Sequence, residues 1–532
     1  MYEAVPDGPS SRFHCLRLLT SEIVIRLLSM LLLALALAPG AAAQPETLLL
    51  PGDPDVSDRF GSAVAISGEI AVVGAYGDDG ATLNAGAAYV FRRTASGWAQ
   101  ETKLTAADAL PGARFGDAVA AEGDRVFVGV PRDSAAFYGG GAVYVFARDA
   151  GTGTWVEEAK LLPSDLGTSY RFGVAVAVVG DLLAVGAPRA TGAGFDTGAV
   201  YVFRRDATSG AWVEEAKLFS DTIGFDNVFG LDLALASGPA GEFVVANEAP
   251  KFDRFTAYVF ARTGDPDGPN GGWVEEFDLG TLVPPGTFFG SGPAVSAAGP
   301  DVFALVGTDV EGVYAFHREG GSRGPMWVEE ALLPLSIYAS ALDGAVALLG
   351  DPGDDDPGVA YVYERTADAG GVVWVERAQL TASDGAGNDG FGRAVALDGK
   401  TAVVGAPLAD PMGLSGAGAS YAYDLAPVLD AAEPAPPEEA LVLRVFPNPA
   451  ASSGPVTLAF RLPAPSAVRV SVYDVLGREI ALVEEGTRAA GTHRVRVATA
   501  GLTAGVYVVR AVIAEEGSAT TRTFTRRLTL LR

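Results

Sequence analysis

The chain has 532 residues, of which 67 are glycine and 33 proline; 49% are hydrophobic and only 19% are charged. This composition is too apolar for a disordered protein and too rich in turn-forming residues for a helical bundle, so it predicts an all-β fold. The formal charge is −27, from 38 basic and 65 acidic residues. Because nucleic-acid binding depends on basic surfaces, this charge argues against a nucleic-acid partner.

Residues 1–43 are predicted to be a secretory signal peptide. An apolar run from Leu27 to Ala38 follows two arginines and is followed by small residues that end in an Ala-x-Ala pattern. The run is too short to span a bilayer, so we expect cleavage between Ala43 and Gln44. The alternative is an uncleaved membrane anchor.

Cysteine and histidine are too scarce for several kinds of site. The single cysteine, Cys15, lies in the predicted signal peptide, so the mature chain should contain no disulfide, cysteine nucleophile or Cys-ligated metal. Of the three histidines, His14 shares that segment, and His317 and His493 are far apart in the sequence. We therefore expect neither a His-based triad nor a multi-His metal site.

One sequence unit recurs along most of the chain. Six tryptophans, each followed by Val-Glu-Glu or a close variant, lie at Trp98, Trp155, Trp212, Trp273, Trp327 and Trp374. Phe-Gly pairs begin at Phe60, Phe115, Phe172, Phe229, Phe289 and Phe391. The gap between the last two Phe-Gly pairs leaves room for one degenerate copy, at Ile337 to Leu349, so seven units are expected.

Each unit contains four short runs typical of β-strands. In the third unit we expect strands at residues 172–179, 182–188, 198–203 and 212–218, which are rich in branched and aromatic residues and bounded by Gly, Asp and Pro. Four-stranded units that cannot bury their own faces are typical of a β-propeller. The sequence thus predicts a seven-bladed propeller over residues 44–425.

The ends of the repeat region predict how the ring closes. The seventh unit, from Phe391 to Asp424, has only three predicted strands, whereas Glu46 to Leu50 resembles the end of a fourth strand. We expect this N-terminal segment to complete the last blade, so that no sheet edge stays unpaired between the first and last blades. A monomer is expected.

The units resemble FG-GAP repeats, a family named for a Phe-Gly pair and a later Gly-Ala-Pro. Both parts are present at Phe172-Gly173 with Gly186-Ala187-Pro188, and again at Phe391-Gly392 with Gly405-Ala406-Pro407. The family includes the seven-bladed head of integrin α chains. The resemblance covers about residues 45–425. It implies an extracellular binding and adhesion platform.

The C-terminal part is predicted to be a separate module. Residues 426–440 are rich in Pro, Ala and acid and read as a linker. Residues 441–532 contain twelve Arg and six acids, a balance of 12 − 6 = +6, and short alternating runs that predict a β-sandwich.

Residues 441–532 resemble the C-terminal sorting domain of the type IX secretion system. The resemblance rests on five segments in order, with these landmarks: Pro447, Asn448, Pro449, Asp474, Gly477, Arg478, Gly505 and Tyr507. It implies passage through the periplasm and across the outer membrane by the type IX machinery, often with removal of the domain and attachment of the passenger to the cell surface. His493 is interpreted as a strand-edge residue.

No cofactor is expected, although one acidic loop is a weak candidate for calcium. Its residues are Asp351, Asp354, Asp355 and Asp356. Calcium prefers several carboxylate and carbonyl oxygens in one loop, but no unit has the alternating Asp-x-Asp-x-Asp-Gly pattern of calcium-binding FG-GAP blades. Turn formation by Asp, Gly and Pro is the favoured interpretation.

The repeated Glu-Glu pairs are interpreted as solvated outer-strand residues, because a catalytic carboxylate pair occurs once and not once per unit. We therefore expect a non-enzymatic, secreted or surface-anchored binding protein whose ligand is a protein or a glycan. The alternative is a propeller hydrolase or lyase that acts on polysaccharide. Because blades four to six depart most from the repeat, we expect the ligand to map between Phe225 and Asp356.

Overall fold

The structure is a computed structural model that describes most residues from 45 to 531. Outside the described residues lie 1–44, 81, 193, 195, 220–227, 249–255, 265–268, 284–288, 298–300, 309–311, 322–323, 354–355, 369–370, 432–442, 447–449, 452–455, 463–464, 475–476, 490, 498, 500–501, 504, 516–520 and 532. The predicted signal peptide and its cleavage site at Ala43 and Gln44 therefore lie outside them, as do most of the linker, Asp354, Asp355 and the motif Pro447, Asn448 and Pro449.

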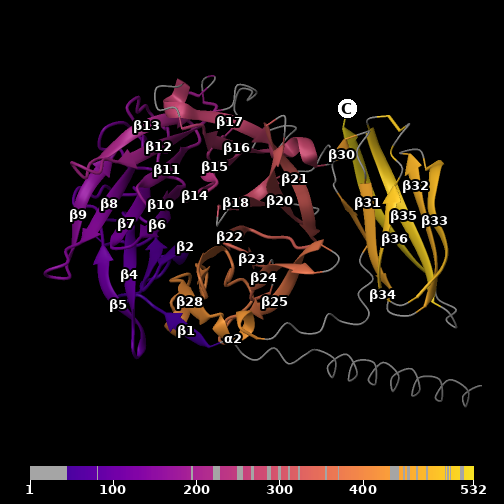
Figure 1. Cartoon of the computed structure of the whole chain (residues 1–532). Coiled ribbons are helices and arrows are strands. Elements are labelled where there is room, and N and C mark those ends of the chain that lie inside the picture. Colours follow the sequence, from indigo (N-terminus) through magenta and orange to yellow (C-terminus); the bar gives the residue numbers. More distant parts are fainter. Residues whose placement is uncertain are drawn as a thin grey trace, which may run out of the picture. The chain divides into compact units, whose positions relative to one another are not determined.

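Seven four-stranded antiparallel sheets surround a common axis, which confirms the predicted seven-bladed propeller (Figure 1). Blades one to four consist of β2 (Phe60–Ser67), β3 (Ile70–Ala75), β4 (Ala87–Thr94) and β5 (Gly97–Leu104); β6 (Ala118–Glu122), β7 (Arg125–Val130), β8 (Ala142–Arg148) and β9 (Trp155–Leu161); β10 (Val176–Val179), β11 (Leu182–Ala187), β12 (Ala199–Arg205) and β13 (Trp212–Leu218); and β14 (Leu233–Gly238), β15 (Gly241–Glu248), β16 (Thr256–Arg262) and β17 (Trp273–Asp278).

The remaining blades follow the same strand order. They consist of β18 (Phe289–Ser296), β19 (Phe303–Thr308), β20 (Val313–Gly321) and β21 (Gly324–Leu333); β22 (Ala339–Asp343), β23 (Val346–Asp351), β24 (Val359–Asp368) and β25 (Gly371–Leu380); and β26 (Ala394–Asp398), β27 (Thr401–Ala406), β28 (Ala419–Asp424) and β1 (Glu46–Leu49). The described helices are short: η1 (Pro269–Gly272), η2 (Leu279–Leu282), η3 (Pro411–Gly413) and α2 (Ala426–Leu429).

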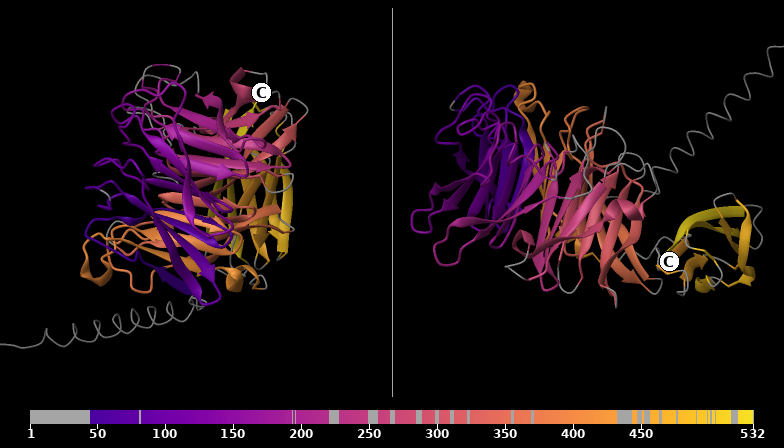
Figure 2. Two further views of the ribbon diagram at one scale, coloured as in Figure 1. Left: turned by 90° about the vertical axis from the view of Figure 1, so that its left-hand side faces the viewer. Right: turned by 90° about the horizontal axis from the view of Figure 1, so that it is seen from above.

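The second and third strands of each blade are covered on both faces, because neighbouring blades stack face to face (Figure 2). In blade three, β11 is buried along its whole length, and β12 is buried from Ala199 to Phe203. Strands buried on both faces are near-continuous apolar runs, which is why the sequence of each unit reads as two such runs.

The ring closes as predicted, with β1 as the fourth strand of blade seven. It pairs antiparallel with β28, from Glu46 opposite Tyr423 to Leu49 opposite Ser420. The side chain of Leu49 is 1% exposed and belongs to the apolar cluster between blades seven and one, whereas Leu48 is 41% exposed. The segment Glu46–Leu49 thus completes a blade made by a distant part of the chain.

The Phe-Gly pair joins each blade to the one before it. In blade three, Phe172 is fully buried and packs edge-on against Tyr201 and Phe203, with ring centroids 5.6 and 6.0 Å apart. Its backbone bridges to Gly141 of blade two instead of continuing its own sheet. The first strand, β10, therefore begins only at Val176, later than the predicted residue 172.

Two glycines of the FG-GAP pattern touch across five of the seven blade interfaces, as far as the structure describes them. A Cβ atom built on Gly129 of β7 would lie 2.0 Å from the carbonyl oxygen of Gly173 in the next blade, closer than any real contact. Only glycine allows two backbones to approach so closely. The same contact recurs at Gly74 with Gly116, Gly186 with Gly230, Gly350 with Gly392 and Gly405 with Gly61.

The C-terminal domain has two sheets, consistent with the predicted β-sandwich. One sheet has the order β29 (Leu443–Phe446), β31 (Val456–Leu462), β34 (Gly491–Val497); the other has the order β30 (Ala450–Ala451), β36 (Thr521–Leu531), β35 (Gly505–Glu515), β32 (Ser466–Asp474), β33 (Glu479–Arg488). Buried side chains from both sheets form one apolar core. Among the described residues, no helix has the length and apolar character needed to cross a membrane.

Replacing Leu49 by Ala should destabilise the propeller by about 2–4 kcal/mol, because it leaves a cavity where the first and last blades meet. The matched variant Leu48→Ala removes an exposed side chain from the same strand and should change stability by about 0.5 kcal/mol or less. Chemical denaturation of both variants measures the difference. Equal stability of the two would contradict closure of the ring by β1.

Replacing Gly129 by Ala should destabilise the fold by about 2 kcal/mol or more, since the added methyl group would collide with the backbone of blade three. Gly320→Ala is a suitable control, because nothing lies within 4 Å of a Cβ at that position. The melting temperatures of the two variants give the comparison. A Gly129→Ala protein as stable as the control would show that the blades can separate without cost.

Candidate functional site

Two kinds of loop meet at one end of blades two and three. The leading loop joins the fourth strand of the previous blade to the first strand, and the middle loop joins the second strand to the third. In blade two, Arg114 ends the leading loop and Arg132 begins the middle loop, and the amide of Arg132 donates to the carbonyl of Ala113 at 3.3 Å. The two arginines are therefore close neighbours although 18 residues separate them.

Blade three repeats this arrangement. Arg171 ends its leading loop, Arg189 begins its middle loop, and the amide of Arg189 donates to the carbonyl of Tyr170 at 3.4 Å. Blades two and three are adjacent, so the two pairs lie side by side. We refer to Arg114, Arg132, Arg171 and Arg189 as the arginine cluster.

A hydrogen-bonded latch fixes the loops that carry the arginine cluster. In blade two, the ammonium of Lys160 donates to Asp108 of the leading loop at 2.7 Å and to Asp133 of the middle loop at 2.9 Å. The hydroxyl of Tyr144 donates to the same two carboxylates. Burial and these carboxylates raise the pKa of Tyr144, so the hydroxyl stays protonated and remains a donor.

The latch of blade three uses the same residue types with one change. Lys217 donates to Asp165 of the leading loop and to the carbonyl oxygen of Thr191 in the middle loop, and Tyr201 donates to Asp165 at 2.6 Å. Both loops of each blade are thus tied to that blade's own third and fourth strands. The arginines are mounted on fixed loops, which is what a preformed binding site requires.

The positive charge of the arginine cluster is only partly balanced. The guanidinium of Arg114 forms an ion pair with Asp117, at 2.8 Å. Within the described part of the chain, Arg132, Arg171 and Arg189 have no ion-pair partner. Burial lowers the pKa of Arg171, and repulsion from Arg189, Arg132 and Arg114 lowers it further. A bound anion would relieve this repulsion.

Two members of the cluster also have a strained backbone. Arg114 and Arg171 have φ angles of 64° and 56°, in the left-handed region, and Arg59 of blade one has 60° at the equivalent position. Blade seven meets the same requirement with Gly390, at φ 70°. A non-glycine residue in this region costs about 1 kcal/mol, so the backbone would be more stable with glycine. A strained position that holds arginine in three blades points to a role for the arginine side chain.

Aromatic side chains border the cluster. The guanidinium of Arg114 lies over the ring of Tyr76, 3.9 Å from its centroid. Phe137 and Tyr138, in the middle loop of blade two, are 47% and 79% exposed. The carbonyl of Tyr138 accepts from the amide of Ser169, two residues before Arg171. An exposed aromatic pair therefore stands beside the junction of the two arginine pairs.

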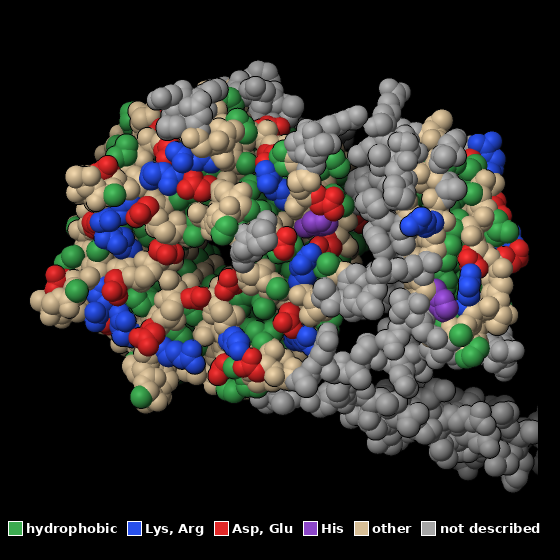
Figure 3. Space-filling view, in the orientation of Figure 1, with side chains coloured by type: hydrophobic (Ala, Val, Ile, Leu, Met, Phe, Trp, Pro, Cys, Tyr) green, Lys and Arg blue, Asp and Glu red, His purple; other side chains and the backbone are tan. Residues whose placement is uncertain are grey.

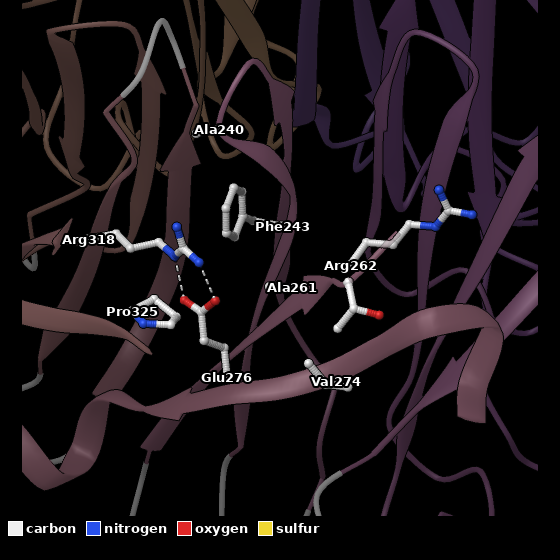
Figure 4. Close-up of a pocket in the computed structure, with 9 residues that line it drawn as sticks. Ala240, Phe243, Ala261, Arg262, Val274, Glu276, Arg318 and Pro325 are labelled. Carbon is white, nitrogen blue, oxygen red and sulfur yellow. Dashed lines mark hydrogen bonds and ion pairs between the residues drawn. The ribbon is translucent and has the colours of Figure 1, made fainter. Parts of the chain in front are cut away.

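The predicted ligand region between Phe225 and Asp356 is only partly described, and a groove in it differs in character from the arginine cluster. The groove lies between blades four and five, has a volume of about 430 Å³, and is lined by Phe243, Arg262, Glu276 and Arg318 among others (Figure 4). Arg318 makes two hydrogen bonds to Glu276, both at 2.7 Å, and Arg262 points away from them toward Glu215, at 3.0 Å. The charges that line this groove are already paired.

The interpretation of the Glu-Glu pairs as solvated residues is wrong for the second glutamate of three pairs, Glu215, Glu276 and Glu330, whereas Glu158 is exposed as expected. The carboxylate of Glu276 in β17 accepts from the indole of Trp327 in the next blade, at 2.9 Å, and its side chain is only 8% exposed. Equivalent contacts join Glu101 to Trp155, Glu215 to Trp273 and Glu330 to Trp374, each with an arginine of the following blade. Figure 3 shows such neighbouring basic and acidic side chains at intervals around one face of the propeller.

The calcium candidates remain untested. In the described part of the acidic loop, Asp351 accepts from the amide of Gly353 and Asp356 from that of Gly358, as expected for residues that stabilise turns. The described residues contain no group of three His, Cys, Asp or Glu side chains placed to hold a metal ion. Asp354 and Asp355 are outside the described residues, so these four aspartates stay a prediction.

The described sorting landmarks form a turn and a loop in the C-terminal domain. Asp474 accepts from the amide and the guanidinium of Arg478, at 2.9 and 2.7 Å, around Gly477 with φ 78°. After Gly505, the first residue of β35, the buried Tyr507 donates from its hydroxyl to the carbonyl of Thr503, at 2.8 Å. These residues therefore have clear roles in the fold of the domain.

His493 lies in β34, at the edge of its sheet, and stacks on Phe460 with ring centroids 5.5 Å apart. This agrees with its interpretation as a strand-edge residue.

Comparisons with known proteins agree with this architecture. The sequence matches the FG-GAP repeat over residues 45–91, 98–146, 155–203 and 374–423, and the secretion system C-terminal sorting domain over residues 444–525. The chain is an FG-GAP repeat protein with a type IX sorting domain. This sorting domain implies interaction with the type IX machinery and export across the outer membrane, to the cell surface or into the medium.

The other two comparisons add little about this FG-GAP repeat protein. A crystal structure of Saccharomyces cerevisiae Sqt1 is 10% identical, and the alignment covers 92% of this chain and 100% of that one with a TM-score of 0.38. That score is too low to support an inference. No curated protein matches the chain.

The stability of the propeller should fall in acid because of the glutamates between blades. Burial raises the pKa of Glu215, but hydrogen bonds from Arg204 and Trp273 outweigh this and hold it below the ordinary 4.5; the pKa of Glu101 is lowered in the same way by Trp155, Arg92 and Arg148. Their stabilisation is therefore complete above about pH 4.5 and is lost as the pH falls through the lower folded values.

Melting temperatures between pH 7 and pH 3 test this expectation. The double variant Glu101→Gln, Glu215→Gln should melt lower than the parent at pH 7, and the difference should shrink toward pH 3. Asp430→Asn is the control, because its ion pair with Lys400 is exposed and should contribute about 1 kcal/mol or less. A constant difference between the double variant and the parent across the range would contradict the role of these carboxylates.

Proposed function

We propose that this exported protein is a non-enzymatic binding and adhesion protein that holds its ligand on the loop end of blades two and three. The observation that carries the proposal is the arginine cluster: three of its guanidiniums have no ion-pair partner among the described residues, although the chain as a whole has a charge of −27. Such a local excess of positive charge favours association with an anion.

The setting of the arginines supports binding rather than catalysis. The latches hold both loops of each blade, so the site is preformed and no rearrangement is needed to accept a ligand. Asp117, the carboxylate within the cluster, is engaged by Arg114. Burial raises the pKa of Asp117 although Arg114, Arg132 and Arg171 lower it, so the support for binding comes from the fixed loops and the arginines without an ion-pair partner.

A second candidate, a polysaccharide hydrolase or lyase, is favoured by one residue. Asp232 stands at the start of the inner strand of blade four, where blades two and three have Ala118 and Ala175. Burial raises its pKa to about 6, in the range of a general acid, while its own backbone amide donates to the side chain of Asn247 at 2.9 Å.

One set of measurements separates the two candidates. The exported protein is applied to an array of neutral and acidic glycans and acidic surface proteins, and each ligand that binds is then incubated with it and analysed for cleavage. The binding proposal expects retention of a ligand without any turnover. Turnover that is lost in Asp232→Asn would overturn it in favour of the enzyme.

A further inference from the structure

We propose that the arginine cluster recognises the carboxylate groups of an acidic polysaccharide, a polymer that contains uronic acids. This inference rests on the proposed function, since it names the ligand class for the same loop end of the propeller. Three features of the site support it: the ion pair of Asp117, the repetition of arginines in adjacent blades, and the exposed aromatic residues beside them.

The internal anion shows which chemistry the site accepts. Asp117 presents a carboxylate to the guanidinium of Arg114 at 2.8 Å, and both side chains are partly shielded from water. Guanidinium groups are planar forks that match the geometry of a carboxylate and can donate two parallel hydrogen bonds to it. Arg132, Arg171 and Arg189 offer the same fork with no carboxylate of the described chain to receive it.

The repetition of the charges points to a polymer. The pairs Arg114 with Arg132 and Arg171 with Arg189 occupy equivalent positions of adjacent blades, and Arg59 continues the first position into blade one. A polymer that carries negative groups at repeated intervals can engage several of these arginines at once. Each further contact then adds to its affinity, a gain that a ligand with one negative group lacks.

The border of the site suits a sugar chain better than a peptide of acidic residues. Phe137 and Tyr138 are exposed and belong to a loop whose backbone bonds the amides of Ser169 and Arg171. Their rings offer flat apolar surfaces on which the C–H face of a pyranose can stack. A nucleic acid would carry such a repeated charge too, but the acidic remainder of the chain would repel its long duplex.

The test uses the exported protein and polygalacturonate oligomers as the probe, with Kd measured by titration at low and at physiological salt. We expect saturable binding that weakens as salt rises, because salt screens the ion pairs. Neutral dextran oligomers of the same length should not bind. Tighter binding of dextran sulfate, polyglutamate or a DNA duplex than of polygalacturonate would overturn the assignment to a carboxylated sugar.

Variants connect the binding to the cluster. Arg171→Gly and Arg189→Ala should each raise the Kd for polygalacturonate about tenfold, as expected for the loss of one charge-assisted interaction. Arg93→Ala is the control, because it removes the same charge at the far end of β4, the third strand of blade one, where Arg93 donates to Thr401. It should leave the Kd unchanged. Arg171→Gly should also melt no lower than the parent, because glycine relieves the strained φ of 56°.

The outcomes distinguish this inference from the proposed function. If polygalacturonate binds equally well to Arg171→Gly, Arg189→Ala and the parent, the assignment of the cluster is wrong while the protein remains a binding protein. If the parent cleaves polygalacturonate, the proposed function itself fails. If Arg171→Gly lowers the melting temperature by several degrees, the arginine has a structural role and the inference is overturned.

Discussion

The contact between two glycines at five of the seven blade interfaces is the constraint on which the rest of the propeller depends. The backbones of Gly129 and Gly173 approach so closely that no side chain fits between them. This contact lets Phe172 leave its own sheet and bridge to the preceding blade, while its ring stays buried against its own blade. The Phe-Gly pair and the Gly-Ala-Pro segment of the family pattern therefore form the two sides of one blade interface.

Because this interface consists of backbone atoms, side chains of the neighbouring loops are available to contact a ligand. The latch of Lys160, Tyr144 and two aspartates ties the loops of blade two to its outer strands, and the glycine contact holds the inner end. An exposed loop side chain such as Arg132 can then vary with little effect on the core. Farther out, buried glutamates that accept from a tryptophan of the next blade join the fourth strands.

The sequence predicts the parts of the structure that recur and misses those that depend on neighbouring blades. Seven units, four strands in each and closure by Glu46 to Leu49 follow from repeated landmarks. Glu215, Glu276 and Glu330 looked solvated because the tryptophan that each of them bonds lies 58, 51 and 44 residues later in the chain. In the sequence Arg114 and Arg132 look like ordinary loop residues, because only the folded blade places them side by side. The one sequence signal for the arginine cluster was the recurrence of arginine before Phe-Gly.

Closure by β1 has a consequence for the order of folding. Glu46 and Tyr423 are separated by 377 residues, so theirs is among the most costly contacts of the propeller in loop-closure entropy and among the last to form. Until β1 docks, β28 is an open edge strand with unpaired backbone groups. Molecules that meet in this state can exchange N-terminal strands and form dimers or chains, so the incomplete ring is the species that favours aggregation.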